Sequence, residues 1–186
     1  MPAGTPTDPP HLDTGRAHPA RVYDWLLGGK DNHPVDEAVG EELPSEARDA
    51  ARQNRRFMHR AAARLAGQGI DQFLDIGSGI PTEPNLHRIV QGVVPTAKVV
   101  HTDNGPIVLR HAEALLSSGP EGATDYVQAD VRDPDGIIRH ARGVLDFERP
   151  IALSLITLLH FLPDDQDPSA SSVSRGPRCR RAATSC

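Results

Sequence analysis

Three acidic residues are spaced so that each would follow a successive strand of a parallel sheet. Asp75 ends an apolar stretch and precedes Gly77 and Gly79, Asp103 ends the next apolar stretch, and Asp130 the one after it. In a doubly wound sheet, ligands bind beyond the carboxyl ends of the strands, so these carboxylates would converge on one crevice. The two glycines allow a sharp turn and a close approach of the backbone to a ligand.

The turn after Asp75 favours a ligand without a pyrophosphate. A nicotinamide fingerprint has a third glycine three residues after the second. That position is Thr82, and Asp75 would lie poorly against a pyrophosphate. A carboxylate there suits a cofactor that carries an ammonium group. The pattern therefore disfavours a nicotinamide-dependent oxidoreductase.

The elements that must position these acids alternate between strand and helix from residue 70 onward. Strands are predicted at 70–76, 98–102, 126–129 and 151–162, and helices at 85–91, 106–117 and 134–141. The stretch 151–162 is almost wholly apolar, which is typical of a strand buried on both faces. This order predicts an α/β fold with a Rossmann-like, doubly wound and mainly parallel sheet.

Three helices are predicted before the first strand, after a Pro/Thr-rich lead (1–18) that we expect to be disordered. The first, 19–27, would end at Gly28, and the second would span 34–43. The third would be capped by Ser45 and end at Gly67 and Gly69. Its apolar stripe is expected to comprise Ala47, Ala50, Ala51, Phe57, Met58, Ala61, Ala62 and Leu65.

The glycine turn and its acids resemble the cofactor motifs of class I S-adenosylmethionine-dependent methyltransferases. The resemblance implies that Asp75 faces the methionine end of the cofactor and that Gly77, Ser78 and Gly79 line it. It also implies that Asp103 takes both ribose hydroxyls, beside Asn104. Asp130 would hold the adenine amino group, beside Val131.

A narrower resemblance covers residues 19–168. Residues 21–32 (RVYDWLLGGKDN), 54–57 (NRRF), 73–82 (FLDIGSGIPT) and 159–161 (LHF) resemble an actinobacterial family of uncharacterised methyltransferases. In that family the N-terminal helices, here 19–69, form a lid over the cofactor-binding half, here 70–168. The candidate lid contacts are Tyr23, Lys30, Asp31, Asn54 and Arg55.

The expected reaction is methyl transfer from S-adenosylmethionine to a small-molecule acceptor. Because the sulfonium methyl is already activated, alignment supplies most of the gain, up to ~7–11 kcal/mol in the best cases. His160, at the end of the fourth predicted strand, is the candidate base where the acceptor is protonated; the alternative is that it is a hydrogen-bonded core or rim histidine.

Arg55 and Arg56 could form a solvated helix face or an anion site, and His101 is expected to be a strand residue without chemistry. The alternative function is a non-catalytic S-adenosylmethionine-binding pseudo-enzyme.

The composition gives little support for a nucleic-acid or membrane partner. A net charge of -5 gives no general reason to expect a nucleic-acid partner, and no apolar run approaches the ~20 residues of a membrane span. Without an apolar signal segment, a cytoplasmic protein is expected. Cys179 and Cys186 are isolated thiols in a polar tail, so neither a disulfide nor a metal site is predicted.

The composition changes abruptly after Pro168. Residues 169–186 contain five Ser, four Arg and no acid, whereas a class I fold would continue with a helix and further strands. Four arginines without aromatics give thin support for nucleic-acid binding. We expect the sheet to lack its last strands, and hypothesise a reading-frame shift near 167–170. The edge formed by 151–162 would then be exposed.

Overall fold

The computed structural model describes residues 14–106, 108 and 121–158. Within these ranges, four parallel strands form one sheet in the order β3-β2-β1-β4. The elements are α1 (Pro19–Leu27), α2 (Pro34–Glu42), α3 (Ala47–Gly67), β1 (Gln72–Ile76), α4 (Leu86–Val93), β2 (Lys98–Asp103), β3 (Ala123–Gln128), α6 (Pro134–Ala141) and β4 (Ala152–Ser154). The predicted Rossmann-like α/β fold is confirmed.

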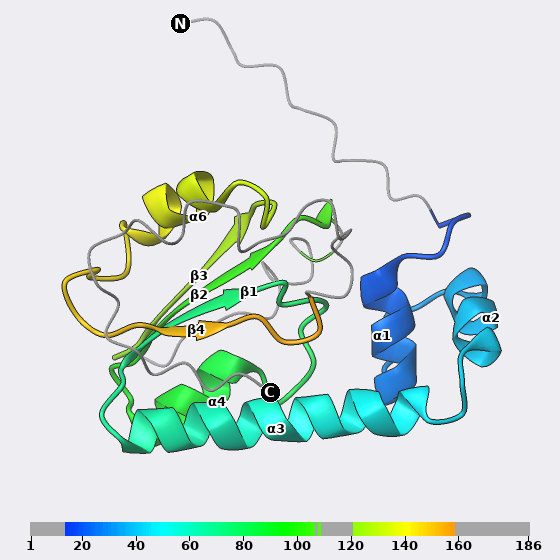
Figure 1. The fold of residues 1–186 in the computed structure, drawn as a ribbon, viewed down its shortest axis with the longest axis horizontal. Coiled ribbons are helices and arrows are strands. Elements are labelled where there is room, and N and C mark those ends of the chain that lie inside the picture. Colours follow the sequence, from blue (N-terminus) through cyan, green and yellow to red (C-terminus); the bar gives the residue numbers. More distant parts are fainter. Residues whose placement is uncertain (1–13, 107, 109–120, 159–186) are drawn as a thin grey trace, which may run out of the picture.

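Helices cover both faces of the sheet. Figure 1 shows α3 and α4 on one face and α6 on the other, with α1 and α2 beside the N-terminal end of α3. One core cluster joins Met58 of α3 and Val90 of α4 to Phe73 of β1. The second joins Ile137 of α6 to Leu74 and Val100 on the opposite face. Removing these side chains from water fixes the layers that carry the strand ends.

The bounds of α1 follow from its end residues. His18 caps its N-terminus, with the Nδ1 accepting a hydrogen bond from the Ala20 backbone N–H at 3.2 Å, and Pro19 occupies the first turn. Gly28 ends it with a φ of 84°, in the left-handed region that glycine adopts without strain. The predicted helix 19–27 is confirmed to the residue. Among the described helices, none is long and apolar enough to cross a membrane.

For α3, the predicted cap was wrong and the predicted apolar stripe was right in part. The N-cap is Glu46, without a side-chain capping bond, because a turn joining the Ala47 N–H to the Pro44 carbonyl places Ser45 outside the helix. The buried residues are Ala51, Met58, Ala62 and Ala66, whereas Phe57 is 39% exposed. The predicted stripe is thus confirmed at Ala51, Met58 and Ala62, while Ala66 was missed because α4 packs against the C-terminal half of the helix.

The strands also differ from the sequence prediction. β3 begins at Ala123, three residues before the predicted 126. β4 has only three residues, and the chain turns after it, with Thr157 at a φ of 61°. The strand predicted over 151–162 was thus too long, and Leu153 is 54% exposed rather than buried, because β4 lies at the edge of the described sheet. Of the lead predicted over 1–18, residues 1–13 lie outside the described residues, as do most of the helix 106–117 and the tail; residues 14–18 are described, and His18 is held by hydrogen bonds to Asp36 and within the α1 cap.

Candidate functional site

The order of the strands reverses at β1. This strand pairs with β2 on one side and with β4 on the other, so the carboxyl end of β1 is the topological switch point. The register places Asp75 beside His101 of β2 and beside Ser154 of β4. In Figure 1 the arrowheads of the strands point toward α1, so the N-terminal helices face this end of the sheet.

The turn after β1 is fixed by backbone bonds to β2. Gly77 and Gly79 have φ angles of 73° and 65°, where side chains are strained. The N–H groups of Gly77 and Ser78 both donate to the Thr102 carbonyl, at 2.8 and 3.1 Å. A Cβ on Gly77 would also meet the Leu158 side chain at 2.9 Å. Both conditions explain why glycine stands at this position.

Asp103 joins this turn to the one after β2. Its Oδ2 accepts a hydrogen bond from the Gly79 N–H and its Oδ1 accepts one from the Gly105 N–H, each at 2.9 Å. A carboxylate has about four acceptor positions, so each oxygen can accept a further bond. The structure thus brings Asp75, Gly77, Ser78, Gly79 and Asp103 together, as the spacing predicted.

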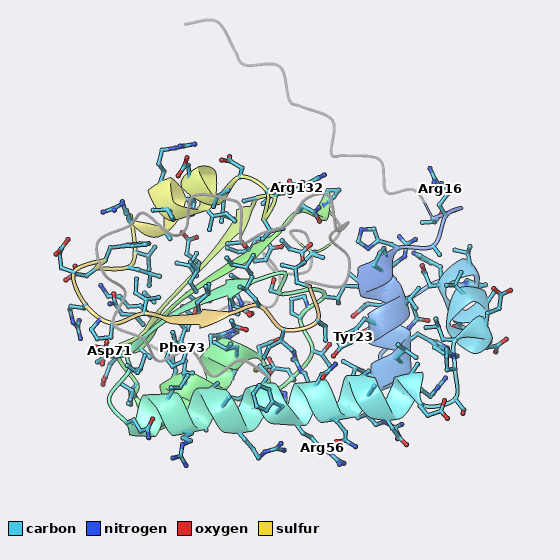
Figure 2. All side chains as sticks on the ribbon, in the orientation of Figure 1. Arg16, Tyr23, Arg56, Asp71, Phe73 and Arg132 are labelled. Carbon is cyan, nitrogen blue, oxygen red and sulfur yellow. The ribbon has the colours of Figure 1, made fainter. Side chains whose placement is uncertain are left out.

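A small pocket lies at the carboxyl end of β1. Its lining residues are Arg55, Asp75, Ser78, Gly79, Pro81, Asn85, Leu86 and His101. Arg55 reaches it from α3, and its Nη2 donates to the carbonyl of Thr82. Burial lowers the pKa of Arg55, while Asp75 acts in the opposite direction. Arg56 points away from the sheet in Figure 2 and is exposed, so the two adjacent arginines have different environments.

A buried histidine pair supports this pocket. The Nδ1 of His101 lies 3.1 Å from the Oδ2 of Asp75. His87 of α4 packs edge to face on His101, with 5.5 Å between ring centroids, and is fully buried. Burial, followed by the neighbouring His101, lowers the pKa of His87 to about 4. His101 is a strand residue, as predicted. Its contact with Asp75 and its packing on His87 were not predicted, because both depend on the register of β1 against β2 and on the position of α4.

Asp130 lies outside this pocket, after β3. It accepts hydrogen bonds from the Arg132 backbone N–H and Nε, both at 2.9 Å, and from its Nη2 at 2.5 Å. Arg132 is the main cause that lowers the pKa of Asp130 to about 2, and the Asn104 side chain also contributes. The structure therefore brings Asn104 to Asp130, with Val131 half-buried next to it.

The first turn of α1 covers the crevice. Ala20 packs against a small apolar cluster of Ile80, Val108 and Tyr126. A Cβ on Gly105 would come within 3.3 Å of the His18 ring. Burial lowers the pKa of His18, so its ring is neutral near pH 7 beside Asp103.

Tyr23 lies between α1 and the sheet (Figure 2), and its hydroxyl donates to the Ala51 carbonyl at 3.2 Å. Burial raises the pKa of Tyr23, which keeps this hydroxyl protonated as a donor. Tyr23 thus joins α1 to α3 beside the pocket that Arg55 lines.

The other predicted contacts lie elsewhere. Lys30 and Asn54 are exposed and do not line the pocket. The turn that contains Lys30 is built around buried Asp24, whose Oδ2 accepts from the Asp31 N–H at 2.9 Å and from the Asn32 Nδ2 at 3.0 Å. His160 lies outside the described residues. Within the described ranges, no group of three or more His, Cys, Asp or Glu side chains could hold a metal ion.

Comparisons with known proteins agree with this geometry. A family model described as S-adenosyl methyltransferase matches residues 5–175. A DUF574 family protein from Streptomyces avermitilis is 49% identical with a TM-score of 0.81, and the match covers 84% of this chain and 62% of that one. A candidate methyltransferase from Thermobifida fusca is 44% identical with a TM-score of 0.76, covering 87% of this chain and 62% of that one.

The chain therefore spans less than two thirds of the length of either solved structure. A search of curated proteins finds no match.

Proposed function

Because this chain belongs to the S-adenosyl methyltransferase family, we propose that it binds S-adenosylmethionine beyond β1 and β2 and transfers the methyl group to a small-molecule acceptor. The observation that carries the proposal is the convergence of Asp75 and Asp103 on one glycine turn, tied by the 2.9 Å bond from the Gly79 N–H to Asp103. A cofactor with an ammonium group and a ribose diol, and without phosphate, matches these carboxylates.

The pocket at β1 fits the amino-acid end of this cofactor. That end carries an ammonium and a carboxylate, and the pocket is lined by Asp75 and by Arg55, which have the opposite charges. The Arg55 Nε and the Ser78 Oγ are buried without a hydrogen-bond partner in the described part of the chain. A buried polar atom without a partner costs about 1–3 kcal/mol, and a bound ligand that supplied partners would recover that cost.

The turns after β2 and β3 fit the other end. Asp103 would accept both ribose hydroxyls through the acceptor positions that Gly79 and Gly105 leave free. Asp130 and Asn104 would contact the adenine. The first turn of α1, which packs on Ile80 and Tyr126, would act as the lid.

The residues of this chain then contribute alignment rather than covalent chemistry. The bound cofactor supplies an activated sulfonium methyl, and in-line positioning of the acceptor is the main source of rate. Tyr23 and Arg55 would hold α1 and α3 against the pocket and limit the access of water. His160 is the proposed base where the acceptor is protonated.

Calorimetry with S-adenosylmethionine tests the cofactor assignment. We expect the wild type to bind it and not to bind NAD. Asp103→Asn keeps one oxygen for the backbone but removes the charge, so affinity should fall about 10- to 100-fold, the value of a hydrogen bond to a charged group. Asp49→Asn is the matched control, since the Asp49 side chain is 79% exposed on α3. Folded wild type that does not bind S-adenosylmethionine would overturn the proposal.

A non-catalytic S-adenosylmethionine-binding chain is the second candidate. It is favoured by the described pocket lining, in which the only imidazole, that of His101, is already bonded to Asp75. Measuring the release of S-adenosylhomocysteine from S-adenosylmethionine in the presence of a panel of small nucleophiles distinguishes the enzyme from the non-catalytic binder. Binding without turnover across the panel supports the second candidate.

A further inference from the structure

The contact between His101 and Asp75 fixes which ring nitrogen carries a proton. An ionised carboxylate only accepts hydrogen bonds, so the Nδ1 of His101, 3.1 Å from the Asp75 Oδ2, is the donor. The Nε2 of the same ring is buried and has no partner among the described residues. A second proton there would leave a buried N–H without an acceptor, which is costly. The geometry therefore favours a neutral imidazole with its hydrogen on Nδ1.

His87 holds this imidazole in place. It packs edge to face against His101, and both of its ring nitrogens are buried without partners in the described chain. A charged His87 would be buried with no acceptor for either ring N–H among the described residues, and this burial is the main cause that lowers its pKa to about 4. The pair is therefore a rigid, uncharged support under the carboxylate.

An uncharged donor has a particular value at this position. A charged partner such as arginine would neutralise Asp75 and weaken its attraction for a cation. A neutral N–H restricts the rotation of the carboxylate and leaves its full negative charge. Asp75 lines the same pocket as Arg55, Ser78 and Asn85.

We propose that His101, supported by His87, is a positioning residue that orients Asp75 as a charged acceptor for the ammonium group of S-adenosylmethionine. This inference rests on the proposed function, because it assigns the amino-acid end of that cofactor to the pocket at β1. His101 acts through Asp75 and does not touch the reacting methyl group. Its effect is therefore confined to ligands that carry the ammonium.

Two product-like ligands isolate this effect. S-adenosylhomocysteine has the whole amino-acid end, whereas 5′-methylthioadenosine keeps the adenine and ribose and lacks the ammonium and carboxylate. Calorimetry measures both on the full chain. His101→Leu should weaken S-adenosylhomocysteine at least about tenfold, the value of a bond to a charged group, and change 5′-methylthioadenosine less than twofold. His101→Asn, whose amide can replace the Nδ1 donor, should restore the affinity for S-adenosylhomocysteine to within about threefold of the wild type.

Val99→Ala is the matched control, because Val99 is a fully buried residue two positions earlier on the same face of β2. It should lower stability without changing the ratio of the two affinities. If His101→Leu does not fold, His101→Gln replaces it, since a glutamine amide reaches the Nε2 position rather than Nδ1. Equal losses for both ligands, or none, would overturn the inference. A wild type that binds neither ligand would instead refute the proposed function.

Discussion

Two buried polar clusters of this chain differ in how completely they are bonded. The first joins α1 to α2 through Arg21 and Asp36, which are 2% and 0% exposed. Asp36 accepts hydrogen bonds from the Arg21 Nε at 2.7 Å, the His18 N–H at 2.9 Å and the His33 N–H at 2.8 Å. Burial alone would raise the pKa of Asp36, but these bonds lower it below its usual value.

The second cluster lies between α4 and the sheet and comprises His87, His101 and Asp75. Its two imidazoles are as buried as Arg21 and Asp36, yet three of their four ring nitrogens have no hydrogen-bond partner in the described part of the chain. Only the bond between His101 and Asp75 is made. Native proteins pair their buried polar groups, so an incompletely bonded cluster requires an explanation.

The difference separates the residues that build the fold from those that serve a ligand. Polar residues of the N-terminal motif have structural roles of this kind: Arg21 joins α1 to α2 through Asp36, and Asn32 ties the following turn to Asp24 of α1. The cluster of His87, His101 and Asp75 borders a pocket. Its ring nitrogens without partners lower the stability of the fold, which a purely structural role would not require. Substitutions in the two clusters should therefore have different kinds of effect.

The largest expected effect is that of Asp36→Asn. This change leaves the Arg21 guanidinium buried without its counter-charge, which typically destabilises a protein by about 3–5 kcal/mol. Urea denaturation followed by circular dichroism measures the free energy of unfolding. The double variant Arg21→Met/Asp36→Leu is the control, and it should recover most of the loss because no charge remains buried. A loss below about 1 kcal/mol for Asp36→Asn would show that the bonded cluster is not structural.

His87→Leu should have an intermediate effect that depends on pH. The folded pKa of about 4 lies below the ordinary value of 6.5, so between these values the unfolded chain binds the additional proton and stability falls as pH falls. At pH 5 the wild type should lose about 2 kcal/mol relative to pH 7.5 through this group, and the variant should not.

Unfolding in urea at both pH values measures this difference. At pH 7.5 the leucine should be neutral or stabilising, since it replaces unpaired polar atoms with apolar ones. His140→Leu is the control, because His140 lies in an exposed pair with Asp125. An identical pH dependence in the wild type and His87→Leu would contradict the burial of an uncharged His87.

The sequence predicted the helices whose ends carry strong signals. For α1 and α6 the bounds 19–27 and 134–141 are confirmed, because each begins with proline after a capping residue, and α1 ends at a glycine. Ser45 was assigned a capping role on residue type alone, and a turn from Pro44 overrides it. The length of β4 could not be predicted from the sequence either, since a run of apolar residues does not show where the backbone leaves the strand and turns.

The site was predictable to the extent that it depends on spacing along the chain. Strand ends place Asp75 and Asp103 in one crevice, and the positive φ angles of Gly77 and Gly79 agree with the glycine pattern. The bond between Asp75 and His101 depends instead on the register of β1 against β2. Register comes from packing across the sheet and leaves no mark in a single sequence.

The smallest expected effect concerns Asp130, a half-buried acid whose main partner, Arg132, is exposed. Arg132 donates three hydrogen bonds to the Asp130 carboxylate. A surface ion pair of this kind contributes about 0.2–1 kcal/mol. If Asp130 holds the adenine amino group, Arg132→Met frees two of these acceptor positions, because the backbone N–H remains. S-adenosylhomocysteine should then bind about 1.4- to 5-fold more tightly by calorimetry. Arg139→Met is the control, because Arg139 is an exposed residue of α6, and it should leave the affinity unchanged. Weaker binding by Arg132→Met would show that Arg132 contacts the ligand itself. Arg132 and Asp130 would then serve the ligand, as His87, His101 and Asp75 do, and would not serve only the fold.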